Sequence, residues 1–160
     1  MWLCVIDVGH ARLRSRIMAR NLIDSKIVDQ LIVEAKVAMT KAYVPYSGYT
    51  VGAALLAKDG TVITGCNIEN AAYSPTCCAE RVAFFKAVSS GVKEFTAIAV
   101  CGGKGGIIAD AFPPCGVCRQ VMQEFCDPEK FVIIVIKPDS YEEFLLKELL
   151  PYGFDNSHMC

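Results

Sequence analysis

The chain has 160 residues, of which 53% are hydrophobic and 21% charged; this composition is typical of one compact domain and excludes a disordered chain. The formal net charge is −1, but residues 1–22 carry four arginines against one aspartate, so the remainder holds 12 basic and 16 acidic residues. That acidic remainder has no basic run interleaved with aromatic residues, which argues against nucleic acid as a partner or substrate.

Residues 1–22 are expected to form an N-terminal extension, and residues 23–160 a single domain. The opening residues have no basic region and too short an apolar stretch for a signal peptide. An Arg-rich organelle leader and a start at Met18 stay open as alternatives. No apolar run approaches the roughly 20 residues that span a bilayer, and nine cysteines, an odd number, favour reduced thiols. We therefore expect a soluble, cytoplasmic protein.

Hydrophobic periodicity and turn residues predict four helices and four strands. In chain order these are a helix at 24–42, strands at 49–57 and 61–66, a loop at 67–76, a helix at 78–89, a strand at 96–101, a helix at 115–125, a strand at 131–136 and a helix at 141–149. Asp24 suits the N-cap of the first helix, and Asp59-Gly60 predicts a two-residue hairpin turn. The glycine-rich stretch 101–106 lacks the spacing of a phosphate loop, so we interpret it as a mobile connection.

The most informative feature is a pair of cysteine motifs. Cys78-Ala79-Glu80 opens one predicted helix and Pro114-Cys115-Gly116-Val117-Cys118 opens another, and helix N-termini favour thiolate over thiol. The two histidines, His10 and His158, lie near the chain ends, far from both motifs. A metal site built here would therefore have only sulfur ligands.

These residues suit a catalytic zinc site. A closed structural zinc usually has four protein ligands, whereas a hydrolytic zinc has three and leaves the fourth position to water. Cys78, Cys115 and Cys118 supply three ligands. Glu80 lies two residues from a ligand and can accept a proton from that water without coordinating the metal. Cys-x-Glu followed by Pro-Cys-x-x-Cys is a signature of zinc-dependent nucleobase deaminases.

A structural zinc site and a redox site are the alternative roles for these cysteines. Cys115 and Cys118 would be half of a structural zinc ribbon if a second Cys-x-x-Cys pair existed, but the sequence has none. A redox Cys-x-x-Cys would need a thioredoxin-like βαβ opening, which the sequence around Cys115 lacks. The remaining cysteines are expected to be apolar core residues or free thiols; they are Cys4, Cys66, Cys77, Cys101, Cys126 and Cys160.

Three thiolates leave a zinc dication with a net negative charge, which opposes ionisation of its water. Arg81, directly after Glu80, is the expected donor to the ligand sulfurs, and Arg119, directly after Cys118, is a second. An ordinary surface ion pair is the alternative for either arginine.

Five segments in one order resemble the small, homotetrameric cytidine deaminases. They are Ala42-Tyr43-Val44-Pro45-Tyr46-Ser47, Val51-Gly52-Ala53-Ala54-Leu55-Leu56, Asn67-Ile68-Glu69-Asn70-Ala71, Cys78-Ala79-Glu80-Arg81 and Pro114-Cys115-Gly116-Val117-Cys118-Arg119-Gln120. The resemblance covers roughly residues 24–155. It implies an α/β fold of the cytidine-deaminase type, with three αβα layers around a mixed, mostly five-stranded sheet, and one zinc per chain.

The resemblance also implies substrate contacts. The family's ribose contacts fall on Asn67 and Glu69, for which turn formation is the alternative role. Ala79 is expected near the exocyclic nitrogen of the base. Tyr49 stands where the family has phenylalanine, which keeps an aromatic face near the base and adds a hydroxyl. Tyr73 and Phe154 are candidates to complete the site of a neighbouring subunit, or only to pack an interface.

The implied activity is hydrolytic deamination of cytidine and 2'-deoxycytidine to uridine and 2'-deoxyuridine with release of ammonia, as in pyrimidine salvage. Glu80 would pass the proton of the attacking water to N3 of the base. A related aminonucleoside deaminase and a non-catalytic zinc-binding scaffold are the alternatives. A polynucleotide cytosine editor would need a basic, aromatic groove, which the acidic remainder of the chain lacks.

Overall fold

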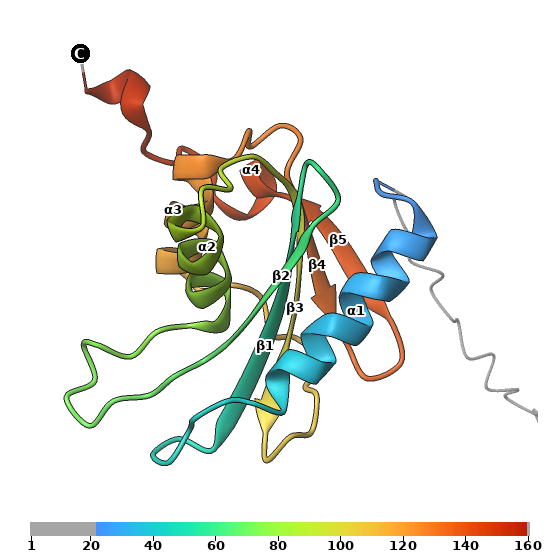
Figure 1. Cartoon of the computed structure of the whole chain (residues 1–160), viewed down its shortest axis with the longest axis vertical. Helices are drawn as coiled ribbons and strands as arrows, with labels where there is room; N and C mark the ends of the chain where they lie inside the picture. The colour runs from blue at the N-terminus through green and yellow to red at the C-terminus, as the bar shows by residue number, and fades with distance from the viewer. Residues whose placement is uncertain (1–21, 160) are drawn as a thin grey trace, which may run out of the picture.

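The fold is built on one five-stranded mixed sheet (Figure 1). A computed structural model describes residues 22–159. Its elements are α1 (Ser25–Met39), β1 (Tyr49–Ala57), β2 (Val62–Cys66), α2 (Ala79–Ser89), β3 (Phe95–Lys104), α3 (Gly116–Phe125), β4 (Val132–Ile136), β5 (Tyr141–Leu145), α4 (Leu146–Leu149) and a short 3-10 helix (Asn156–His158). The strand order is β2-β1-β3-β4-β5, in which β3 and β4 run parallel and the other neighbours antiparallel.

Helices cover both faces of this sheet. In Figure 1, α1 lies on one side of the strands, and α2 and α3 lie on the other. Two clusters of buried side chains fill the two interfaces, one including Leu31 and Ile134, and the other including Phe84, Ile98 and Met122. The predicted three-layer αβα arrangement with a mixed five-stranded sheet is confirmed.

The first helix forms where the sequence predicts it. The Asp24 side chain accepts a hydrogen bond from the Lys26 amide at 2.8 Å, which satisfies one of the free amides of the first turn. Gly52 in β1 faces this helix, and a Cβ there would lie 2.0 Å from the carbonyl oxygen of Ala35. The missing side chain lets α1 pack directly on β1. The helix ends at Met39, three residues before the predicted end.

The predicted hairpin forms, but its turn is longer than two residues. The amide of Ala57 donates to the carbonyl of Thr61 at 2.9 Å, so Lys58, Asp59 and Gly60 make a three-residue connection. Gly60 has φ +91°, the left-handed conformation that such a loop requires at its last position.

The glycine-rich stretch 101–106 is only in part the connection that the sequence predicts. Strand β3 continues to Lys104, and Gly102 and Gly103 pair with Val51 and Thr50 of β1. The close approach of the backbone requires glycine here, because a side chain would collide with its neighbours. A Cβ on Gly103 would lie 1.7 Å from the carbonyl oxygen of Ile107.

The predicted helix at 141–149 is wrong over its first half. Residues Tyr141–Leu145 form β5, which pairs antiparallel with β4, and only the four residues of α4 are helical. Phe144 packs against one core cluster while Tyr141 and Leu145 pack against the other, an alternation of period two. The good helix formers in this stretch are overridden because β5 covers the edge of β4 that does not pair with β3.

The expected N-terminal extension lies outside the described residues except for Leu22. Within residues 22–159, no helix is both long and apolar enough to cross a membrane.

Candidate active site

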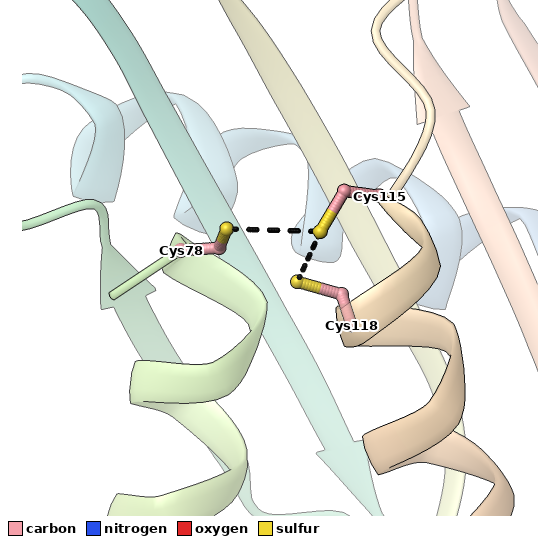
Figure 2. A group of neighbouring side chains, drawn as sticks. All are labelled: Cys78, Cys115 and Cys118. Carbon is pink, nitrogen blue, oxygen red and sulfur yellow. Dashed lines mark hydrogen bonds between the residues drawn. The ribbon is translucent and has the colours of Figure 1, made fainter. Parts of the chain in front are cut away.

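Two helix N-termini bring the three motif cysteines together. Cys78 is the N-cap of α2, Cys115 is the N-cap of α3, and Cys118 lies in the first turn of α3. Their sulfurs point toward one another in Figure 2. The Sγ atoms of Cys78 and Cys115 are 3.9 Å apart, and those of Cys115 and Cys118 are 3.5 Å apart.

This cluster fits a tetrahedral zinc ion. Ligand sulfurs about 2.3 Å from the metal lie about 3.8 Å from one another in that geometry, close to the two Sγ distances of 3.5 and 3.9 Å. Among residues 22–159, no histidine or carboxylate joins the group of possible metal ligands formed by these cysteines. Three protein ligands leave the fourth position to water, as in hydrolytic sites.

The position of α2 depends on a glycine in β2. Gly65 lies under the first turn of α2, where a Cβ would be 2.3 Å from the carbonyl oxygen of Ala79 and 2.6 Å from the amide nitrogen of Ala83. Ala79 and Ala83 are themselves fully buried. Small residues on both sides therefore allow the helix backbone to rest on the strand, which fixes the start of α2, where Cys78 and Glu80 lie.

Thiolate formation is favoured at Cys78. Its contact with Cys118 and the nearby guanidinium of Arg81 lower the pKa of the Cys78 thiol well below its usual range. The same sulfur contact raises the pKa of Cys118, so the proton of the pair stays on Cys118. A lowered thiol pKa at Cys78 favours the thiolate, which is the form that binds zinc.

Glu80 is buried beside the cysteines. Only 4% of its surface is exposed, and this burial raises the pKa of its carboxyl to about 7, with the Cys78 thiolate adding to the rise. A carboxyl group with a pKa near neutrality can both accept and return a proton at physiological pH. The structure therefore places a group suited to proton transfer in the first turn of the helix that Cys78 caps.

Arg81 contacts the ligand cluster, as its position in the sequence suggests. Its Nη2 donates to the carbonyl of Thr76 at 2.9 Å and lies 3.8 Å from the Sγ of Cys78. The carbonyl holds the guanidinium in place, and its positive charge offsets part of the negative charge on sulfur.

Arg119 makes different contacts from those the sequence suggests. Its Nε donates to the carbonyl of Pro114 at 2.7 Å, and its Nη1 donates to the carbonyl of Leu149 at 2.7 Å. The side chain folds back along α3 and ties the residue before Cys115 to the end of α4. It braces the backbone of the motif, and these two donors are used by backbone carbonyls.

We expect Arg81→Gln to weaken zinc binding about 10- to 100-fold, because the Cys78 thiolate loses its nearest positive charge. Competition with a colorimetric zinc chelator measures this affinity. Arg119→Gln is the matched control, since it removes contacts to carbonyls and should lower thermal stability more than zinc affinity. An Arg81→Gln protein that holds zinc as tightly as the wild type would contradict this role.

Asn67 and Glu69 lie next to the start of β1, and both already hold the backbone there. The Asn67 Oδ1 accepts from the amide of Val51, and its Nδ2 donates to the carbonyl of Tyr49, both at 2.8 Å. Glu69 accepts from the amide of Tyr46 at 2.9 Å and from the hydroxyl of Ser47 at 2.5 Å. The Ser47 hydroxyl lowers the pKa of Glu69, so this carboxylate is ionised.

Tyr49, at the start of β1, is 44% exposed and has two neighbours that sequence reasoning missed. The ring of Phe112 stacks on it at 6.3 Å between centroids, and the Nζ of Lys104 lies 5.9 Å from the Tyr49 centroid. Phe112 belongs to a connection with no periodicity, so no sequence signal could have found it. Ser47 was also missed as a partner of Glu69, although it belongs to a segment that carries the family resemblance.

A cavity of about 340 Å³ opens beside Glu69. Its lining consists of Tyr46, Ser47, Glu69, Tyr73 and Thr76. Tyr73 is 76% exposed and adopts φ 58°, a left-handed conformation that is uncommon for an aromatic residue. The loop that carries it reaches out from the body of the domain in Figure 1.

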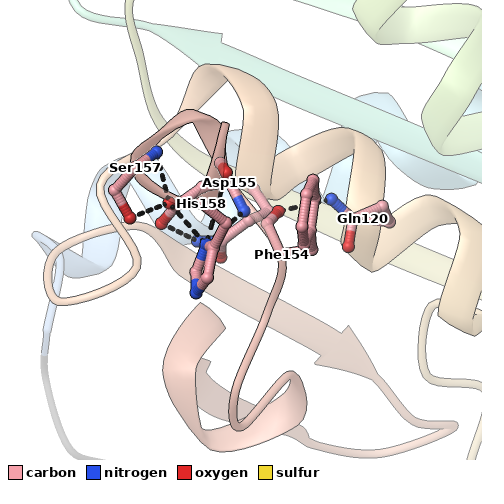
Figure 3. Close-up of polar contacts among 6 residues, drawn as sticks. Gln120, Phe154, Asp155, Ser157 and His158 are labelled. Atoms are coloured by element: carbon pink, nitrogen blue, oxygen red, sulfur yellow. Dashed lines mark hydrogen bonds and ion pairs between the residues drawn. The ribbon is translucent and has the colours of Figure 1, made fainter. Parts of the chain in front are cut away.

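Phe154 lies on a C-terminal segment that leaves the domain above α3 (Figure 1). Figure 3 shows its backbone tied to that helix, where the Gln120 Nε2 donates to the Phe154 carbonyl at 2.7 Å. Its ring stacks on His158 at 5.1 Å between centroids, and 56% of the residue is exposed. The structure thus holds Phe154 on the surface of its own chain.

Comparison with known sequences identifies the family. Residues 25–135 match the family described as the cytidine and deoxycytidylate deaminase zinc-binding region. The chain is 51% identical over 132 residues to the cytidine deaminase of Sporosarcina psychrophila, covering 82% of this chain and 94% of that protein. It is 49% identical over 132 residues to the cytidine deaminase of Halalkalibacterium halodurans, covering 81% of this chain and 95% of that protein.

Solved structures agree. A 1.6 Å crystal structure of cytidine deaminase from Burkholderia pseudomallei superposes with a TM-score of 0.69 at 42% identity, covering 79% of this chain and 98% of that chain. The cytidine deaminase of Mycobacterium tuberculosis superposes with a TM-score of 0.67 at 38% identity, covering 79% and 96%. With its buried Glu80 beside three clustered cysteines, the chain belongs to the zinc-binding cytidine and deoxycytidylate deaminase family.

Proposed function

We propose that this protein catalyses hydrolytic deamination of cytidine and 2'-deoxycytidine to uridine and 2'-deoxyuridine with release of ammonia. One observation carries the proposal: a buried carboxyl group, Glu80, lies in the first turn of a helix whose N-cap, Cys78, clusters with Cys115 and Cys118. The enzymatic alternative is deamination of a related aminonucleoside, and a comparison of substrates tests it. A non-catalytic zinc scaffold would give no reason to bury a carboxyl group there.

The roles follow from the chemistry of the site. Cys78, Cys115 and Cys118 would hold the zinc, which would supply, when bound, a water molecule acidic enough to act as a nucleophile at neutral pH. Glu80 accepts a proton from the water that attacks C4 of the cytosine ring and delivers it to N3. It then carries the remaining proton, from the new C4 hydroxyl, to the amino group, so that the C4–N bond breaks, ammonia leaves and the C4 carbonyl of uridine forms. The backbone of Ala79 borders the exocyclic nitrogen. The positive charge of Arg81 offsets part of the negative charge on the ligand sulfurs.

The sugar is bound by groups that the fold holds in place. Glu69 uses three hydrogen bonds on the Tyr46–Ser47 backbone and the Ser47 hydroxyl, and a carboxylate has about four acceptor sites, so one is free for a ribose hydroxyl. Asn67 keeps one N–H and one lone pair beyond its two bonds to β1. Tyr49 contributes an aromatic wall for the base.

The test is ultraviolet absorbance of zinc-quantified protein mixed with cytidine, 2'-deoxycytidine or adenosine. We expect the cytidine absorbance to fall with about one zinc per chain, and the adenosine absorbance to stay constant. Protein that holds zinc but leaves both cytidine nucleosides unchanged would overturn the proposal and support the scaffold alternative. Because residues 23–160 are acidic in balance, we expect no comparable activity on polynucleotides.

The active form in this proposal is a homotetramer whose sites are completed across subunits. The support is the exposure of Tyr73 and Phe154, at 76% and 56%, on segments that extend from the domain. We expect Phe154→Ala to raise KM for cytidine while the tetramer persists, because the lost ring contributes to a neighbour's site. Mass photometry combined with kinetics at falling protein concentration measures both. Monomers with full activity would contradict shared sites.

The cytoplasm is the proposed compartment. Seven cysteines within residues 22–159 are free thiols, including Cys66, Cys77, Cys101 and Cys126 outside the sulfur cluster. Reduced thiols in this number suit a reducing environment.

A further inference from the structure

The connection between β3 and α3 folds back over the end of the sheet. The amide of Ala109 donates to the carbonyl of Gly102 at 2.9 Å, and the amide of Gly105 donates to the carbonyl of Gly48 at 2.9 Å. The second bond ties this connection to the residue just before Tyr49. The connection is thus anchored at Gly105 to the start of β1 and at Ala109 to β3.

The connection places the ring of Phe112 on β3, beside the ring of Tyr49. A Cβ on Gly102 would lie 2.5 and 2.6 Å from two ring carbons of Phe112, so the ring lies directly on the glycine backbone. From there it stacks on Tyr49 at 6.3 Å with 26° between the planes. Lys104, paired with Tyr49 across the two strands, brings its Nζ to 5.9 Å from the Tyr49 centroid.

We propose that Phe112 is a positioning residue for substrate binding, which acts by fixing the orientation of the Tyr49 ring. The inference rests on the proposed function, because it requires Tyr49 to contact the base. Phe112 itself lies behind Tyr49 and packs with the core cluster that contains Met122 and Cys118.

The Tyr49 backbone and the Tyr49 ring are held by different groups. Asn67 donates to the Tyr49 carbonyl at 2.8 Å, and the Tyr49 amide donates to the Ser47 hydroxyl at 3.0 Å. Neither bond restricts rotation of the ring, which is on a residue 44% exposed to solvent. Stacking on Phe112 and the Lys104 cation are the contacts that select one orientation.

The same connection also leads to the metal cluster. Phe112 is three residues before Cys115, so the backbone that carries a zinc ligand also carries the support for the base-binding ring. The two parts of the site are therefore placed by one segment. Because Phe112 touches the aromatic wall and not Glu80, its loss should weaken substrate binding and leave the chemical step intact.

The test is a double-mutant cycle on KM and kcat for cytidine. We expect Phe112→Leu to raise KM about three- to tenfold with kcat and zinc content unchanged, the size of one aromatic pair. Phe112→Tyr should restore the wild-type KM. In a Tyr49→Leu background, Phe112→Leu should add little, because the ring through which it acts is gone.

A matched control separates positioning from general core packing. Phe125 belongs to the same core cluster and stacks on Phe84 at 6.0 Å, away from Tyr49. Phe125→Leu should lower thermal stability and leave KM unchanged. The inference is overturned if Phe112→Leu still deaminates cytidine with the wild-type KM. It is also overturned if the effects of Phe112→Leu and Tyr49→Leu on KM are fully additive. A wild-type protein inert toward cytidine would instead overturn the proposed function.

Discussion

Glu80→Gln is expected to lower kcat for cytidine by a factor on the order of 10² to 10⁴, the range contributed by a positioned general acid or base. Glutamine has nearly the same shape as the buried carboxyl group but cannot accept the proton of the attacking water or return it to the base. Zinc content and binding of the product uridine should be retained, because the three cysteines and the residues at the sugar are untouched. Steady-state kinetics, metal analysis and calorimetry with uridine measure the three quantities.

Stability provides an internal check on this variant. Burial raises the pKa of Glu80 to about 7 in the zinc-free protein, so ionising this carboxyl group near neutral pH costs free energy in the folded zinc-free chain but not in the unfolded chain. A neutral glutamine avoids that cost, and the variant should unfold no more easily than the wild type. The control is Glu94→Gln, at an exposed residue that pairs with Lys58, which should leave kinetics unchanged. Substantial turnover by Glu80→Gln would exclude Glu80 as the proton carrier.

The metal cluster could be anticipated from sequence because its determinants are local. Cys78 and Cys115 each occupy the N-cap of a helix whose start the sequence predicts, and Cys118 follows within one turn. Three sulfurs can bind one zinc only if the starts of the two helices lie side by side. With both helices on one face of a sheet, this requirement leaves few possible arrangements of α2 and α3. Glu80 was likewise placed by its distance of two residues from a ligand.

Tertiary contacts between elements were not anticipated. The residues of β5 have the composition of a helix, and only the unpaired edge of β4 makes them a strand. Gly102 looked like a flexible joint, yet it is a strand residue whose missing side chain makes room for Phe112. Arg119 was expected at the sulfurs, but the carbonyl of Leu149, thirty residues away, takes one of its donors. In each case a tertiary contact decides the outcome.

Gly65→Ala is expected to destabilise the fold and displace the catalytic helix together. The added methyl carbon would lie 2.3 Å from the Ala79 carbonyl oxygen and 2.6 Å from the Ala83 amide nitrogen, both backbone atoms that cannot rotate away. Overpacking of this kind costs about 1–3 kcal/mol, and more where backbone must move. Because the clash is under the first turn of α2, the movement should separate Cys78 and Glu80 from the cysteines of α3.

Three measurements on Gly65→Ala should therefore change in parallel: the denaturation midpoint, the zinc affinity and kcat. Gly116→Ala is the matched control, since it adds the same methyl group at the start of the other ligand-bearing helix with no atom within 4 Å. Alanine is the better helix former by about 0.5–1 kcal/mol, so this control should unfold at equal or higher denaturant concentration. If Gly65→Ala loses stability but keeps its zinc affinity and kcat, a shift of α2 does not displace Cys78 and Glu80 from the cysteines of α3. The geometry of the sulfur cluster would then depend on α3 and the metal more than on the contact between α2 and β2.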